Sequence, residues 1–400
     1  MTNDADTTPL SPSGSPPTTA TSIDDKERLA RMALCAISDP ANPKLCDLVA
    51  AFGAVEVWRC LREGDSEAAV ARRARSLDLA EVGEATTASG TRFLIPGDDE
   101  WPQGVQALGW CSVGEWRGAP FGLWAAGPAR LDAMTRSAVA VVGARAATNY
   151  GEHAAADFAA GLAEKGITIV SGGAYGIDAA AHRGSLAVAG PTIAVLAGGL
   201  GSYYPVGNTH LFERIRETGL LVSEQPPTRP PSRVRFLTRN RLIAALSGAT
   251  LVVEGSSRSG ASNTARWCGA VGRPILAVPG PITSTLSATP HRLIRCGEAT
   301  LVASVDDVLE AIAPLNAEEL PAASEHVDPQ EELTTTEHDV AEALPARGSV
   351  TPGDLVALTG LTPLKVGAAL VGLAEKGLIV EAKPGAWKRR RGTGERKSHG

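Results

Sequence analysis

Three short segments of this sequence carry residue types that bind phosphate. Each follows an apolar run and is rich in glycine, whose bare backbone lets a ligand approach closely. Unpaired N–H groups and helix N-termini at such turns favour anions, phosphate above all. Glycines at turns often serve only a steric need, so the signal lies in the three segments together. The candidates are Gly143 and Arg145, then Ser171, Gly172, Gly173 and Gly176, and finally Gly198 and Gly199.

The first of these segments does not match the common nucleotide-cofactor motifs. It reads GARAAT rather than G-x-G-x-x-G, and no acidic residue closes the next apolar run at 168–170, where a ribose hydroxyl would need one. The chain also lacks the G-x-x-x-x-G-K-[ST] motif of P-loop ATPases. We therefore expect no nicotinamide, flavin or other cofactor.

The charge of the chain is distributed unevenly. Its formal net charge is −6, but residues 229–295 carry +9, between an N-terminal part of −8 and a C-terminal part of −7. This basic segment holds ten arginines, no lysine and one acid, Glu254. Guanidinium groups form a planar fork for phosphate and stack on bases, so the composition indicates a polynucleotide partner. Any single arginine could instead form an internal salt bridge.

The run RFLTRNRLIAAL supplies the most specific candidates in the basic segment. It follows a proline-rich loop at 225–231 and begins a predicted helix. We predict that Arg145, Arg239 and Arg241 pair with phosphates, and that Asn240 positions the strand or a base edge. Binding of this kind shows little sequence preference and weakens steeply with salt.

Other candidates for chemistry have simpler structural explanations. Asp178 and His182 are four residues apart on a predicted helix, but no third ligand lies nearby and Asp178 falls where a capping carboxylate is expected. Ser171 lacks the G-x-S-x-G context of a nucleophile. Glu254 ends a predicted strand beside the arginines, so we expect it to orient one of them. We predict no catalytic residue and no metal site.

A parallel sheet is needed to bring these candidates together. From residue 137 onward, short apolar runs alternate with alanine-rich stretches, which is typical of a doubly wound, Rossmann-like α/β domain. Ligands bind such sheets beyond the carboxyl ends of the strands, where the glycine segments fall. The strands are expected at 138–142, 168–170, 192–197, 220–223, 250–254, 274–278 and 300–302.

Composition divides the whole chain into six parts. Apolar residues recur at helical spacing before residue 84, and three short helices with a possible hairpin follow an acidic stretch near the C-terminus. We predict a disordered leader at 1–24, a small helical domain at 25–84, an extended Rossmann-like domain at 85–313 with its core at 137–313, an acidic linker at 314–334, a winged-helix-like domain at 335–390 and a basic tail at 391–400.

The six cysteines and the hydropathy pattern point to a cytoplasmic protein. The cysteines lie far apart without a C-x-x-C pair, so neither a zinc ribbon nor a disulfide scaffold is expected. The N-terminus has no basic and apolar leader, and no apolar stretch is long enough to cross a membrane. We expect no membrane partner.

The motifs VVGARAATNYG, IVSGGAYGIDAAAHRGSL, RFLTRNRLIAALS and VVEGSSRSGASNTA follow one another in this order. In this region, about 137–313, the chain resembles the DNA-processing protein A family (DprA or Smf). The resemblance implies an extended Rossmann domain that binds and protects single-stranded DNA and helps load the RecA recombinase in natural transformation or recombination. It implies a dimer with no established catalysis. The implied DNA-binding residues are Arg145, Ser171, Gly172, Arg239, Asn240, Arg241, Ser259, Gly260 and Thr264, and the implied dimer contacts lie near Leu293, Ile294 and Leu301.

The sequence departs from the family pattern at a few positions. Gly173 and Tyr175 stand where the family commonly has Leu and Arg, so one cation of the pocket is missing. Tyr175 could stack on a base or bond a phosphate instead. Leu237 and Thr238 replace Pro and Arg, and Thr289 replaces a Gly. These changes bear on affinity and on the geometry of the pocket.

The leading hypothesis is a non-enzymatic mediator of recombination that binds single-stranded DNA, forms a homodimer and acts with RecA. One alternative is a nucleotide-processing enzyme of the phosphoribohydrolase (lysine-decarboxylase-like) type, although its P-G-G-x-G-T segment is missing. Another is a double-stranded DNA regulator that uses the winged helix. The third helix of that domain carries only Lys365 and Lys376 and no Arg, Asn or Gln to read bases, so we expect partner contact there.

Overall fold

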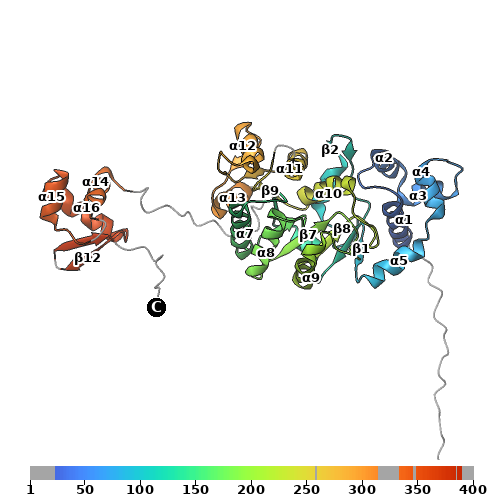
Figure 1. Ribbon diagram of the computed structural model, residues 1–400, viewed down its shortest axis with the longest axis horizontal. Helices are drawn as coiled ribbons and strands as arrows, with labels where there is room; N and C mark the ends of the chain where they lie inside the picture. The colour runs from blue at the N-terminus through green and yellow to red at the C-terminus, as the bar shows by residue number, and fades with distance from the viewer. Residues whose placement is uncertain (1–22, 257–258, 314–332, 346–347, 384, 390–400) are drawn as a thin grey trace, which may run out of the picture. The chain divides into compact units, whose positions relative to one another are not determined.

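The described part of the chain folds into two compact units, which meet in the sequence between Pro321 and Ala322. The computed structural model describes residues 23–256, 259–313, 333–345, 348–383 and 385–389 (Figure 1). The predicted basic tail and nearly all of the predicted leader and linker fall outside these residues, and the last two residues of the predicted leader begin the first helix. The first unit, here called the sheet unit, holds the glycine segments and the basic segment.

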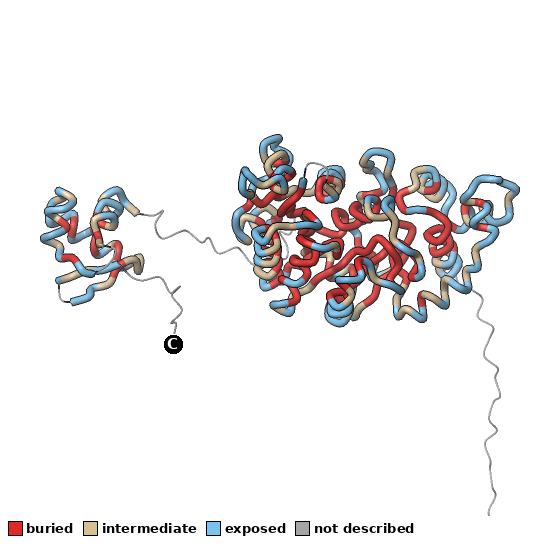
Figure 2. The backbone as a smooth tube through the Cα atoms, viewed as in Figure 1, coloured by how far each residue is buried: buried red, intermediate tan, exposed pale blue. Residues whose placement is uncertain are grey.

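Five helices open the sheet unit. Asn42 caps the second by accepting a hydrogen bond from the Leu45 amide, and Pro43 occupies its first turn. Their apolar residues, including Leu34 and Ile37, share one core with Trp124 of the sheet, so the burial is continuous between them (Figure 2). The helices are α1 (Ile23–Ile37), α2 (Pro43–Phe52), α3 (Ala54–Glu63), α4 (Ala69–Ser76) and α5 (Leu79–Ala88).

A nine-stranded sheet forms the centre of the unit, in the order β1-β4-β8-β7-β6-β5-β9-β10-β11. The seven strands from β8 to β11 run parallel, and β4 and β1 extend the sheet in antiparallel fashion. The predicted doubly wound α/β fold is confirmed. The strands are β1 (Arg92–Leu94), β4 (Leu123–Ala126), β5 (Ala138–Val142), β6 (Thr168–Ser171), β7 (Thr192–Leu196), β8 (Leu220–Ser223), β9 (Ala249–Val252), β10 (Ile275–Ala277) and β11 (Thr300–Leu301).

Helices cover both faces of this sheet (Figure 1). One face packs against α7 (Asn149–Glu164), α8 (Ile177–Ala187), α9 (Thr209–Thr218) and α13 (Val305–Ile312), and the other against α10 (Arg233–Ala245) and α11 (Gly260–Ala270). The remaining short elements are η1 (Gln103–Gly109), β2 (Ser112–Val113), β3 (Trp116–Arg117), α6 (Leu131–Met134), η2 (Val206–Asn208), η3 (Thr285–Ser287) and α12 (Ala288–Arg295).

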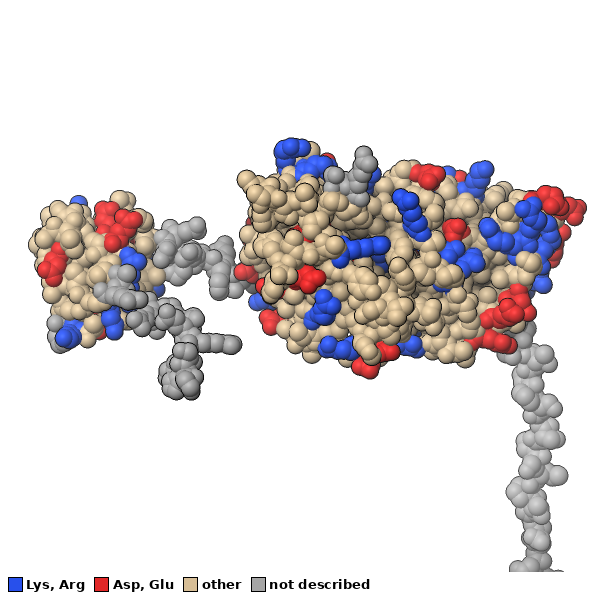
Figure 3. All heavy atoms as spheres, viewed as in Figure 1, with Lys and Arg blue, Asp and Glu red and all other residues tan. Residues whose placement is uncertain are grey.

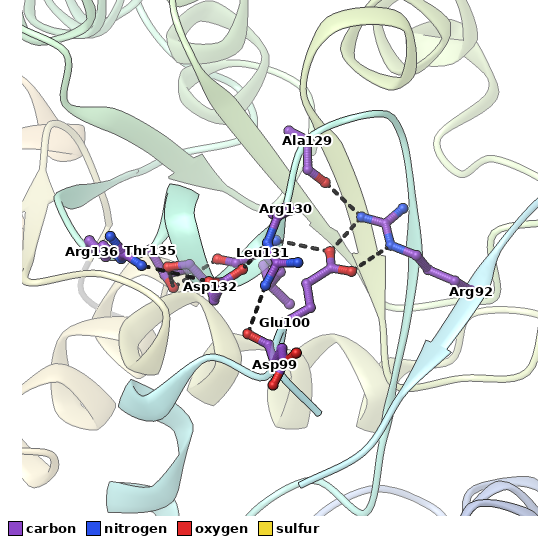
Figure 4. Close-up of polar contacts among 9 residues, drawn as sticks. All are labelled: Arg92, Asp99, Glu100, Ala129, Arg130, Leu131, Asp132, Thr135 and Arg136. Atoms are coloured by element: carbon purple, nitrogen blue, oxygen red, sulfur yellow. Dashed lines mark hydrogen bonds and ion pairs between the residues drawn. The ribbon is translucent and has the colours of Figure 1, made fainter. Parts of the chain in front are cut away.

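A polar network around Glu100 fixes the segment between β1 and β5 (Figure 4). Arg92 donates to both oxygens of Glu100, at 2.9 and 2.5 Å, and to the carbonyl of Ala129 at 2.6 Å. The Leu131 amide donates to the same carboxylate at 3.0 Å. Burial opposes the charge of Glu100, but these bonds outweigh it and lower its pKa. The network therefore ties β1, at the antiparallel edge of the sheet, to the residues after β4 that lead toward β5.

The described residues of the C-terminal unit form three helices followed by a two-stranded wing, so the winged-helix-like fold prediction is confirmed. Thr351 and Asp354 form a capping box at its second helix, which Gly360 ends with a positive φ of 69°. Val366 and Leu373 are fully buried in its core. The elements are α14 (Thr335–Ala343), α15 (Pro352–Thr359), α16 (Pro363–Glu375), β12 (Ile379–Lys383) and β13 (Ala386–Arg389).

Within the described residues no single helix is long and apolar enough to cross a membrane. Two helices, α15 and α16, pass the same test only as a pair that is bent by 113°. All six cysteines are free thiols.

Candidate nucleic-acid interface

A cavity of about 780 Å³ opens where the strand order of the sheet reverses. Here β5 and β9 are neighbours, and the chain moves away from them toward opposite edges, which is the usual ligand site of a doubly wound sheet. Its walls include the loop after β5, Ser256 after β9, Ser259 with the start of α11, and one side of α10. Of the predicted residues, those in the lining are Gly143, Arg145, Arg239, Asn240, Ser259, Gly260 and Thr264.

Arg145 is the predicted phosphate ligand whose side chain is most accessible. The residue is exposed, and its guanidinium carbon lies 4.8 Å from the centre of the Phe236 ring. Phe236 in turn contacts Tyr204, with ring centres 5.7 Å apart. Both rings line the cavity, together with the exposed Arg233. Sequence reasoning did not single out these three as ligand residues, although Arg233 and Phe236 lie in the basic segment 229–295.

Arg239 lies on the floor of the cavity and is only 6% exposed. It donates to the carbonyl of Gly172 at 2.7 Å and to that of Val195, so it ties α10 to the ends of β6 and β7. A side chain at position 172 would meet the guanidinium group, which explains the glycine. Burial lowers the pKa of Arg239 to about 10, an effect that Asp178 opposes, so it keeps its charge at neutral pH.

Arg241 does not belong to the cavity, and the prediction that it pairs with phosphate is wrong. Its side chain is fully buried and donates to both oxygens of Glu224, each at 2.7 Å, and to the Gly118 carbonyl at 3.2 Å. Arg241 lies two positions beyond Arg239 on α10, so its side chain is turned by about 200°, to the opposite side of the helix. Arg241 therefore anchors α10 in the core.

The second and third glycine segments are largely closed by internal contacts. None of the predicted residues Ser171, Gly172, Gly173, Tyr175, Gly176, Gly198 and Gly199 is in the cavity lining. Ser171 donates to the Val141 carbonyl at 2.6 Å, and the Gly199 amide donates to the Arg229 carbonyl at 2.8 Å. A side chain at Gly199 would collide with the Pro226 carbonyl. These glycines permit close packing, which was the steric alternative.

The described residues of the loop after β9, together with the start of α11, form the opposite wall. Ser259 precedes α11 without a side-chain cap, so the amides of the first turn have no partner from that side chain. Thr289, the departure from the family glycine, donates to the Ser256 carbonyl at 2.6 Å and steadies this loop. Asn240 donates to Asn263 at 3.2 Å and accepts from Arg239 at 3.2 Å, so its amide is fixed by α11 and its neighbour.

Asp178 and His182 have the structural roles that were expected. Asp178 accepts from the Ala174 amide at 3.3 Å and borders the cavity; its burial raises its pKa, against the effect of Arg239. His182 is fully buried and shares a hydrogen bond of 2.7 Å with the Thr192 hydroxyl. Burial, with Arg239 and Arg183, lowers the pKa of His182 to about 3, so it is neutral.

Glu254 does not orient an arginine, and that expectation is corrected. One oxygen accepts from the Thr148 hydroxyl at 2.6 Å and the other from the Thr148 amide at 2.9 Å. The carboxylate therefore supports the start of α7, where negative charge is favourable. It is buried and not in the cavity lining, so the geometry does not favour a catalytic role for it.

Most arginines of the basic segment bind other parts of the protein. Beyond Arg239 and Arg241, described contacts join Arg229 to the Ala36 carbonyl, Arg235 to Asp39, Arg273 to the Ala245 carbonyl and Arg292 to Glu298. Arg233, Arg266 and Arg295 are exposed, and Arg258 lies outside the described residues. On the face seen in Figure 3, basic and acidic side chains are interspersed. The +9 segment is thus mainly structural, with a few arginines at the surface.

The predicted dimer contacts have very different environments. Leu293 is 1% exposed and belongs to the core, so it offers little surface to a second copy, and its predicted dimer contact stays a prediction. Leu301 is 48% exposed on β11, which is the last strand at its edge of the sheet. Ile294 is partly buried. No cluster of metal-binding side chains occurs within the described residues.

Comparison with known proteins decides the family. Residues 92–313 match the family described as DNA recombination-mediator protein A. The chain belongs to this family.

Relatives of this recombination-mediator family match well beyond the sheet. A Mycobacterium tuberculosis protein, provisionally named DNA processing protein DprA, is 45% identical over 368 residues, which are 89% of this chain and 92% of the relative. Protein Smf of Escherichia coli is 39% identical over 65% of this chain and 70% of its own length. The crystal structure of DprA from Streptococcus pneumoniae superposes with a TM-score of 0.59 at 30% identity, covering 71% of this chain and 97% of that one. The resemblance to the DprA/Smf family is thereby confirmed.

Proposed function

We propose that this recombination mediator binds single-stranded DNA in the cavity between β5 and β9 without catalysing a reaction. The observation that carries the proposal is the exposed Arg145 stacked on Phe236, with Tyr204 beside it. A cation for a phosphate and a ring for a base thus stand side by side. Arg233 adds a second exposed guanidinium to the lining. Arg239 stabilises the floor of the cavity through its bonds to the Gly172 and Val195 carbonyls.

The aromatic rings favour a single strand over a duplex. Base faces are free to stack on aromatic side chains only when the bases are unpaired, and such stacking tolerates any sequence. The phosphates supply most of the affinity, which makes it sensitive to salt. We therefore expect a strand to follow Arg145 and Arg233 with at least one base on Phe236.

The test is fluorescence anisotropy of a labelled dT20 strand titrated with the protein across a salt series. We expect tighter binding to the strand than to a duplex of equal length, and log affinity that falls linearly with log salt. Equal retention of duplex, or affinity that does not change with salt, would contradict the proposal.

We further propose that the protein works as a dimer and delivers the strand to the RecA recombinase. The exposed edge strand β11 with Leu301 supports the dimer. Sedimentation velocity should show a dimer that Leu301→Glu converts to a monomer, while Leu358→Glu in the C-terminal unit leaves it intact. Co-sedimentation with RecA on dT-rich DNA tests the second step. A cytoplasmic location remains a prediction.

A further inference from the structure

We propose that the N-terminal helices act as a clamp that positions one wall of the DNA cavity, with Asp39 as the positioning residue. The inference rests on the proposed DNA site and adds a function for α1. It concerns residues 226–235, here called the proline-rich segment, which lead into α10. Pro231, Ser232 and Arg233 of this segment line the cavity.

The proline-rich segment has few backbone donors, and one of them closes an internal turn from the Arg229 amide to the Pro226 carbonyl at 2.9 Å. Pro226, Pro227, Pro230 and Pro231 have no backbone N–H to donate. On one side, its carbonyls at Pro227 and Arg229 accept from the amides of the third glycine segment, at 3.0 and 2.8 Å. Its other side needs a second support.

That support comes from the end of α1 and the residues that follow it. Arg235 donates from Nε and Nη2 to one carboxylate oxygen of Asp39, at 3.0 and 2.8 Å, and from Nη1 to the Pro230 carbonyl at 2.6 Å. Arg229 donates to the Ala36 carbonyl at 2.7 Å, where a helix C-terminus favours a cation. Two arginines of the segment thus reach the same stretch of the N-terminal helices.

Arg235 is committed to this contact rather than to DNA. Its side chain is 13% exposed, whereas that of Asp39 is 52% exposed. Arg233, Phe236 and Arg239 all lie within about one turn of Arg235 on α10, so fixing Arg235 also sets the direction in which Arg233 and Phe236 enter the cavity. The N-terminal helices therefore shape the site without touching the strand.

The direction in which one substitution changes DNA affinity distinguishes the clamp from simple electrostatics. Asp39→Asn removes a partly exposed negative charge near a polyanion site, which by charge alone should tighten DNA binding. The clamp predicts the opposite: roughly threefold weaker binding of labelled dT20, the upper range for one exposed ion pair. Asp47→Asn is the matched control, because Asp47 also joins the N-terminal helices to the sheet side, through Arg117, away from the cavity.

Two further measurements complete the test. In the absence of DNA, amide hydrogen exchange of the full chain should be faster in Asp39→Asn for residues 226–236 and unchanged in α7. In an Arg235→Gln background, Asp39→Asn should have no additional effect on dT20 binding. Tighter binding by Asp39→Asn, unchanged exchange, or additive effects would overturn the clamp. The exchange measurement needs no DNA, so failure of the proposed DNA site would be seen separately in the wild-type titration.

Discussion

Two helices of this protein, α10 and α16, are the natural candidates for DNA contact, and the residues that they expose differ in kind. α10 has four arginines, of which Arg233 is exposed and Arg239 borders the cavity. In the winged-helix unit, α16 exposes Leu364 (84%) and Val371 (56%), with Lys365 as a nearby charge. The helix that a motif-based view would place in a major groove thus shows an apolar face.

The comparison teaches that the position of a charge matters more than its presence in a motif. Along α10 the same residue type is exposed at position 233, paired at 235, part of the cavity floor at 239 and fully buried at 241. Only the first and third contribute to a ligand site. A net charge or a motif count cannot separate these roles.

The largest predicted effect concerns a buried arginine of α10. Arg241→Ala leaves the Glu224 carboxylate buried without its partner, so we expect a loss of about 3–5 kcal/mol in the free energy of unfolding. Urea denaturation followed by circular dichroism measures it. Arg266→Ala, on the exposed side of α11, should change stability by less than about 0.5 kcal/mol. Equal effects of the two changes would mean that Arg241 is not an anchor.

A second prediction concerns the pH dependence of stability, which should differ between the two units. The unfolded chain protonates His182 near its ordinary pKa of about 6.5, whereas the folded chain does so only near 3, so stability falls as the pH drops below about 6.5. In the C-terminal unit, the bond from Lys376 lowers the pKa of Glu337 to about 2, so its contribution is lost only below the ordinary value of about 4.5.

The measurement is urea unfolding at pH 7, 6 and 5. Between pH 7 and 5 the wild type should lose about 2 kcal/mol more stability than His182→Gln, which cannot bind this proton. Parallel losses in the two proteins would show that His182 is not buried in its neutral form.

A third prediction concerns the ring in the cavity wall. Phe236→Ala removes a stacking platform, worth about 1–3 kcal/mol per base, so dT20 affinity should fall roughly tenfold with an unchanged salt slope. Val234→Ala is the control, because Val234 is 37% exposed on the same turn and not in the cavity lining. A changed salt slope would indicate lost phosphate contacts rather than lost stacking.

The smallest predicted effect is on the winged helix. Lys365→Ala on α16 should change affinity for dT20 and for duplex by less than about twofold, because its neighbours on the exposed face are apolar. A several-fold loss of duplex binding would restore α16 as a DNA-reading helix and remove the contrast with α10.

The sequence was sufficient to predict the fold and one wall of the cavity. Buried parallel strands form nearly continuous apolar runs, so β5 to β11 and the loop with Arg145 could be located from pattern alone. Pattern could not tell which glycine segments stay open, because Arg239 fills one and the proline-rich segment covers another. Nor could it pair Arg241 with Glu224, since that pairing depends on how α10 packs.

The most direct test of the account removes the two exposed guanidinium groups of the cavity. We predict that Arg145→Ala with Arg233→Ala weakens dT20 binding and reduces the slope of log affinity against log salt by about 1.4, which corresponds to two lost phosphate contacts on a single strand. Arg266→Ala with Arg295→Ala removes the same charge outside the cavity lining and should leave the slope nearly unchanged. If both double variants bind alike, the strand does not follow the cavity between β5 and β9.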